Sequence, residues 1–128
     1  MKIQESAENY LETILILNKR MENVKSIDIV HELGFTKASV SVAMKNLRIN
    51  GYITVDNSGF IKLTPQGTVI AEKIYERHTL LTKFFIQIGV DEKIASEDAC
   101  RIEHVISEES FQAFKKFTSD LNYNKIVK

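Results

Sequence analysis

The chain has 128 residues, 17 acidic and 17 basic, and 44% of its residues are hydrophobic. This composition is typical of a globular protein and excludes a disordered one. With no apolar run of about 18 residues, we expect no membrane-spanning helix. The polar N-terminus lacks the pattern of a secretory signal, and the single cysteine cannot form an intrachain disulfide. The sequence therefore predicts a cytoplasmic protein.

The net charge of zero conceals two segments of opposite sign. Residues 36–62 hold four basic residues and one acidic residue, whereas residues 91–110 hold seven acidic and two basic residues. A basic segment suits phosphates and an acidic segment suits cations. The alternative interpretation is two solvated faces of opposite charge.

The spacing of apolar residues in the first part of the chain predicts three amphipathic helices. We expect them at residues 5–20, 26–33 and 37–50. Their candidate N-caps are Ser6, Ser26 and Thr36. Gly34 and Gly51 are expected to end the second and third helices. The expected buried side of the short second helix consists of Ile27, Val30 and Leu33.

A β-hairpin and three further helices are predicted next. The alternating segments 52–56 and 60–64 flank a turn that contains a glycine, as hairpins require. The helices are expected at residues 65–88, 96–106 and 108–118. Their candidate N-caps are Thr64, Ser96 and Ser107.

Two short helices, a turn and a β-hairpin together make a winged helix-turn-helix. The start of its second helix is expected to enter the major groove of DNA, while basic side chains meet phosphates and the wing lies against the backbone or minor groove. The candidate DNA-binding residues are Thr36, Lys37, Ala38, Ser39, Ser41, Lys45, Arg48, Asn57 and Lys62. The alternative is a winged helix that contacts only proteins, which a basic, hydroxyl-rich surface does not favour.

Cys100, Glu103 and His104 stand at positions i, i+3 and i+4 of the predicted helix 96–106, so their side chains point the same way. Thiolate, carboxylate and imidazole are ligands of divalent first-row metals. One helix cannot complete a coordination shell. The candidate ligands on other helices are Asn9, Glu12 and His78.

Each of these residues also has a simpler interpretation. A lone histidine is often packed or on the surface, a lone cysteine is often a small core residue, and a glutamate is often a surface charge. A Cys–His nucleophilic pair would share one helix, and no glycine loop that could form an oxyanion hole accompanies it. We therefore predict that the protein is not an enzyme and takes no small organic substrate.

The sequence resembles the diphtheria toxin repressor family of metal-dependent transcriptional regulators. The resemblance is colinear through SAENYLETI (6–14), KASVSVAMKNLRINGYI (37–53), LTPQG (63–67), ERHTLLTKFF (76–85), GVD (89–91) and EDACRIEHVIS (97–107). It implies a mainly α fold, with a winged helix-turn-helix DNA-binding domain at 1–73 and an all-helical metal-binding and dimerisation domain at 74–128. It also implies a homodimer on palindromic operator DNA, with metal fixing the orientation of the two reading heads.

Features of both branches of this family occur in the sequence. The iron-responsive branch carries the Cys, Glu and His found at Cys100, Glu103 and His104, whereas the manganese-responsive branch has Glu in place of the Cys. Iron-responsive members usually add an SH3-like domain, and we expect this chain to be a short form without one. The branch-specific ligand position on the first helix, Met or Asp in the family, is Asn9 here.

Other ligand positions of the family match only in part. Glu12 stands where the manganese branch keeps a Glu ligand, and His78 matches a ligand of both branches. Thr82 and Ser96 replace two further ligands of the iron branch. We hypothesise a principal site of Asn9, Cys100, Glu103 and His104, with Glu12 and His78 in a second or shared site.

The sequence thus predicts a metal-dependent DNA-binding regulator that represses metal-uptake genes. Because a thiolate is a soft ligand, Fe(II) is the first choice of metal and Mn(II) the second. Two alternatives stay open. One is a metal-independent winged-helix regulator that senses oxidation through Cys100, and the other is a protein-interaction module with a degenerate metal site.

Overall fold

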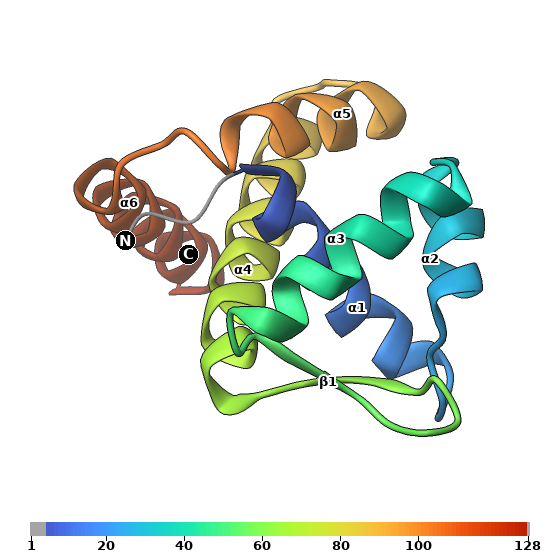
Figure 1. The fold of residues 1–128 in the computed structure, drawn as a ribbon. Helices are drawn as coiled ribbons and strands as arrows, with labels where there is room; N and C mark the ends of the chain where they lie inside the picture. Colours follow the sequence, from blue (N-terminus) through green and yellow to red (C-terminus); the bar gives the residue numbers. More distant parts are fainter. Residues whose placement is uncertain (1–4, 128) are drawn as a thin grey trace. The chain divides into compact units, whose positions relative to one another are not determined.

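The computed structural model describes residues 5–127 and the side chains of residues 5–120. Within them, the chain forms α1 (Glu5–Arg20), α2 (Ser26–Leu33), α3 (Lys37–Ile49), β1 (Ile53–Val55), β2 (Ile61–Leu63), α4 (Pro65–Gln87), α5 (Glu92–Ile102) and α6 (Glu108–Val127) (Figure 1). The predicted mainly α fold with a small wing is confirmed. The chain divides into two compact units between Ile74 and Tyr75, inside α4. None of the described helices has the length and apolar content to cross a membrane.

The first unit is built around α1. Leu11 and Ile14 have no exposed surface, and α1 packs against α2, α3 and β2. Burying such side chains stabilises the fold by about 1.5–3 kcal/mol each. Burial also raises the pKa of the Tyr10 phenol, which therefore stays neutral at physiological pH. The core of this unit consists of Tyr10, Leu11, Ile14, Leu17, Val24, Ile29, Val40, Met44, Leu47, Ile53, Ile61 and Ala71.

The short helix α2 has the predicted bounds but differs from the prediction in its N-cap and on its buried side. Lys25, not Ser26, is the N-cap residue, and its backbone N–H donates to the Asp28 carboxylate at 2.8 Å. Ile29 is fully buried, whereas Ile27 is 37% exposed. The predicted i, i+3, i+6 side is too narrow for a helix that packs against both α1 and α3, so the buried side turns toward Ile29.

A left-handed glycine and a hydroxyl cap link α2 to α3. Gly34 ends α2 with φ of 70°, as predicted. Thr36 caps α3, because its side-chain oxygen accepts from the backbone N–H of Ser39 at 3.1 Å. The helix ends at Ile49 with Asn50 as its C-cap, one residue earlier than predicted. These two ends fix the length and orientation of the helix expected to read DNA.

The wing is an antiparallel hairpin whose strands are shorter than predicted by one residue at each end. Its register pairs Ile53 with Leu63, Thr54 with Lys62 and Val55 with Ile61. The Asp56 carboxylate accepts from the backbone N–H groups of Ser58 and Phe60, both at 2.9 Å, and so shapes the turn. Ile61 N–H donates to the Val24 carbonyl at 2.7 Å, which ties the wing to the segment between α1 and α2.

In the second unit, α5 is displaced from its predicted position. It begins at Glu92 and is capped by Asp91, whose carboxylate accepts from the Lys93 N–H at 3.1 Å. The prediction that Ser96 caps this helix is wrong, because Ser96 is an interior residue of α5. The helix also ends at Ile102, four residues earlier than predicted, and a turn follows.

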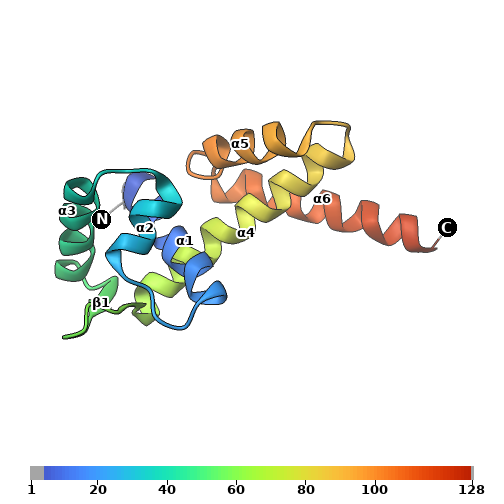
Figure 2. The same cartoon turned by 90° about the vertical axis from the view of Figure 1, so that its right-hand side faces the viewer.

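The last helix begins where predicted and is longer. Ser107 accepts from the Ser110 N–H at 3.0 Å, as an N-cap does. The helix then continues to Val127 instead of ending near residue 118. The rings of Phe84 and Phe114 pack edge to face, with 5.0 Å between their centroids. This contact joins α6 to the later part of α4 (Figure 2).

We predict that Gly67→Ala destabilises the first unit. Alanine normally stabilises a helix relative to glycine by about 1 kcal/mol. Here an added Cβ would overlap the backbone carbonyl oxygen of Tyr52, which also accepts from the Thr64 N–H at 3.1 Å. We expect a loss of about 1–3 kcal/mol in the free energy of unfolding, measured by urea denaturation. The exposed neighbour Gln66→Ala is the control, with a change within about 0.5 kcal/mol. A higher urea midpoint for Gly67→Ala would contradict this packing.

Candidate metal centre and DNA-binding surface

The candidate DNA-binding surface lies in the first unit and consists of α3 and the wing. Val40, Met44 and Leu47 bury the inner face of α3, so the opposite face is open. All nine DNA-binding candidates are exposed. Those at the start of α3 and along it are Thr36, Lys37, Ala38, Ser39, Ser41, Lys45 and Arg48, and those of the wing are Asn57 and Lys62.

Two of these candidates also have a structural role. The Thr36 hydroxyl donates to the Ser39 hydroxyl at 2.9 Å and accepts from the Ser39 backbone N–H. Both side chains therefore hold the start of α3 together while they remain on the surface. Lys37, Lys45 and Arg48 supply positive charge on the same helix, which suits contacts with phosphates.

A second candidate site lies at the end of α5. Donor atoms of Cys100, Glu103 and His104 all lie within 4.8 Å of one another. The Glu103 side chain has no exposed surface, the His104 side chain is 2% exposed, and Cys100 is half-buried. Although α5 ends at Ile102, Glu103 keeps right-handed helical dihedral angles, so the three side chains still converge.

His78 reaches this cluster from α4. Its Nδ1 lies 2.8 Å from the Glu103 carboxylate, and the Nε2 of His104 lies 3.3 Å from the other carboxylate oxygen. An ionised Glu103 carboxylate could only accept, and Nδ1 of His78 would then be the donor. His78 Nε2 then faces the Ser96 hydroxyl at 3.4 Å. One buried carboxylate is thus flanked by two imidazoles and sits beside a thiol.

The remaining candidate ligands, Asn9 and Glu12, lie on α1 in the first unit. Glu12 is 5% exposed, and the backbone carbonyl of Asn9 accepts from the Thr13 hydroxyl at 2.8 Å. The four other candidates belong to the second unit. Sulfur, oxygen and nitrogen donors gathered around the buried Glu103 fit a divalent transition metal, since such a metal binds each of these donor types.

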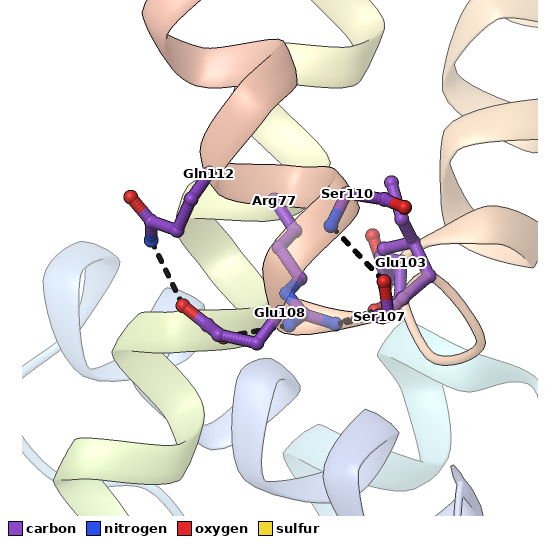
Figure 3. Close-up of polar contacts among 7 residues, drawn as sticks. Arg77, Glu103, Ser107, Glu108, Ser110 and Gln112 are labelled. Atoms are coloured by element: carbon purple, nitrogen blue, oxygen red, sulfur yellow. Dashed lines mark hydrogen bonds and ion pairs between the residues drawn. The ribbon is translucent and has the colours of Figure 1, made fainter.

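Sequence reasoning missed Arg77, which contacts the same turn. Its guanidinium donates to the backbone carbonyls of Glu103 and Ile106 and to the Glu108 carboxylate (Figure 3). A signal was present in the sequence, because Arg77 falls between Ile74 and Leu81 at helical spacing. A charged residue on an otherwise apolar stripe indicates a buried partner.

A winged helix-turn-helix followed by a helical unit with a transition-metal donor set defines a metal-responsive DNA-binding regulator. Two family models agree with this class. The N-terminal DNA-binding domain of iron-dependent repressors matches residues 2–59, and their metal-binding and dimerisation domain matches residues 64–125. The chain belongs to the diphtheria toxin repressor family of metal-dependent transcriptional regulators, as its sequence indicated.

Relatives of known sequence cover most of the chain. An uncharacterised HTH-type transcriptional regulator of Methanocaldococcus jannaschii is 32% identical over 117 residues, which are 90% of this chain and 94% of that protein. The transcriptional regulator MntR of Escherichia coli O6:H1 is 31% identical over 115 residues, which are 90% of this chain and 74% of MntR.

Solved structures share the fold. IdeR of T. acidophilum is 27% identical with a TM-score of 0.71, and the match covers 92% of this chain. The manganese regulator SloR is 24% identical with a TM-score of 0.79 and matches 93% of this chain. This chain spans 55% of the length of either solved chain, about half.

We predict that the cluster at the end of α5 binds Co(II) through Cys100. Thiolate-bound Co(II) absorbs in the near ultraviolet by charge transfer from sulfur, so titration should produce this band. Cys100→Ser should abolish the band and weaken binding by about 10–100-fold or more, the range already caused by losing an outer partner of a ligand. The exposed Ser110→Ala is the control. An unchanged band in Cys100→Ser would show that Cys100 does not bind the metal.

Proposed function

We propose that this protein is a metal-activated transcriptional repressor. In this proposal a homodimer binds a palindromic operator, and a divalent ion holds each reading head in the orientation that matches one half-site. The observation that carries the proposal is the convergence of Cys100, Glu103 and His104 in a chain of this family, beside His78. The bound ion would supply a fixed link between donors on different helices.

The residues of the second unit prepare the site before any ion binds. Burial makes the Glu103 charge costly, and His78 offsets that cost by donating to the carboxylate. Cys100 and His104 hold a sulfur and a nitrogen donor beside the same group. A cation that replaces these partners would bind to donors already close together, so little ordering would be needed.

The link to the reading head would run through α1. We propose that Asn9 and Glu12 add oxygen donors, with Asn9 joining Cys100, Glu103 and His104 in the principal site, and Glu12 and His78 forming a second or shared site. Packing supports this route, because α1 contacts α2, α3 and β2. An ion that fixes α1 would therefore also fix α3 and the wing.

The remaining assignments are part of the same proposal. We propose a DNA-binding domain at 1–73, a metal-binding and dimerisation domain at 74–128, a cytoplasmic location, metal-uptake genes as targets and no enzymatic activity. Fe(II) is the first choice of metal, because the Cys100 thiolate is softer than Mn(II) prefers. Mn(II) is the second choice, and SloR, which shares the fold, is a manganese regulator.

Selection from random duplex DNA tests the function. The protein would be mixed anaerobically with the duplex library at one salt concentration, with chelator, Fe(II), Mn(II) or Zn(II), because phosphate contacts make affinity salt-dependent. We expect a palindrome to be enriched only with metal. Enrichment of the same palindrome with chelator would contradict metal activation, and thiol oxidation at Cys100 would be tested next as the signal.

The exposed cations of α3 give a second prediction. Lys45→Gln and Arg48→Gln should each weaken DNA binding about equally for all sequences. Each should also lower the slope of log affinity against log salt concentration by about 0.9, if each side chain neutralises one phosphate. Lys83→Gln is the matched control, since Lys83 is exposed on α4 in the second unit. Equal slopes in all four proteins would remove both residues from the DNA contact.

A further inference from the structure

We propose that Arg77 is a positioning residue of the metal centre, which holds the ligand-bearing turn 103–106 in its binding conformation. This inference rests on the proposed function, since it concerns the same cluster of donors. Arg77 itself offers no metal ligand, because a guanidinium only donates hydrogen bonds.

The contacts of Arg77 converge on that turn (Figure 3). Its Nη1 donates to the Glu103 carbonyl at 3.1 Å and to the Ile106 carbonyl at 2.8 Å. Its Nη2 donates to the Glu108 carboxylate at 2.9 Å. The guanidinium also lies over the Phe111 ring, 5.3 Å from its centroid. Arg77 therefore spans the end of α5, the following turn and the start of α6.

The balance of charge indicates which of these contacts matters most. Arg77 is 5% exposed, so its charge needs partners. The Glu108 side chain is 54% exposed, so water competes with Arg77 for its carboxylate and weakens that ion pair. The Glu103 carbonyl, at the C-terminal end of α5, carries the negative end of the helix dipole, and its hydrogen bond with Arg77 is buried. The Ile106 carbonyl lies in the turn that follows. The buried partner of Arg77 is thus the backbone that carries Glu103 and His104.

Adjacent residues of α4 hold Glu103 by different atoms. His78 contacts its side-chain carboxylate at 2.8 Å, and Arg77 contacts its backbone carbonyl at 3.1 Å. The rigid fork of a guanidinium can hold two carbonyls in a fixed relation, whereas a lysine ammonium on a flexible stem cannot. Outer groups that orient metal ligands typically contribute about 10–100-fold to metal affinity.

The test measures Co(II) affinity by chelator competition, together with the visible and near-ultraviolet spectrum of bound Co(II). Arg77→Lys keeps the charge and removes the fork, and Arg77→Met removes both. We expect about 10-fold weaker binding for Arg77→Lys and about 100-fold for Arg77→Met, with altered ligand-field bands. Arg101→Met is the control, because Arg101 is exposed on α5 and pairs with Asp98 at 2.8 Å. It should bind as the wild type does.

Thermal unfolding separates positioning from a purely structural role. If Arg77→Lys melts at a lower temperature but binds Co(II) with unchanged affinity and spectrum, the inference is wrong. Should Arg77→Met not fold, Arg77→Lys decides the matter, and Glu108→Gln checks it by removing only the exposed partner. We expect at most about a threefold change in affinity for Glu108→Gln; a loss as large as that of Arg77→Lys would overturn the assignment to the carbonyls. A wild-type protein that fails to bind Co(II) would overturn the proposed function itself.

Discussion

The carboxylate of Glu103 has no exposed surface, and three residues of the second unit surround it. His78 contacts it from α4, His104 lies 3.3 Å from its other oxygen, and Arg77 holds its backbone carbonyl. Because α5 ends at Ile102, the residues that follow form a turn at the end of the helix, which Arg77 can hold. The cost of burying a carboxylate is also what makes a divalent cation a favourable partner for it.

In the proposed mechanism, the first unit would convert a change at α1 into a change at the reading head. Leu11 and Ile14 are fully buried between α1 and the elements it packs against, so α1 cannot turn independently of α3. Gly34 and Thr36 fix the angle between α2 and α3, and Asp56 shapes the wing turn. Within this unit the DNA-binding surface is therefore a rigid body. Regulation by metal then requires only that the orientation of this body be controlled, as the proposal for Asn9 and Glu12 supposes.

Periodicity and capping predicted most of the fold, because those signals are local. The apolar spacing located α1, α3 and the first part of α4, and Thr36 and Ser107 cap their helices as expected. The start of α5 differs from the prediction: Asp91 caps it instead of Ser96, since both residue types cap helices and only the tertiary structure decides between them. The spacing of Cys100, Glu103 and His104 predicted their convergence, while their binding of metal stays a prediction. The place of Arg77 on the apolar stripe of α4 indicates burial, but no sequence pattern encodes its partners, which are backbone carbonyls 26 and 29 residues away.

The central claim is that metal and operator DNA bind to the same conformation of the protein, and reciprocity tests it most directly. The affinity for Mn(II) and Fe(II) would be measured anaerobically at fixed salt, with and without a saturating operator duplex. If metal tightens DNA binding by a given factor, DNA must tighten metal binding by the same factor, typically about 5–150-fold for coupled sites. We expect that increase in the wild-type protein and its loss in Glu103→Ala. Equal metal affinity with and without operator would show that metal and DNA bind independently, and would contradict metal activation.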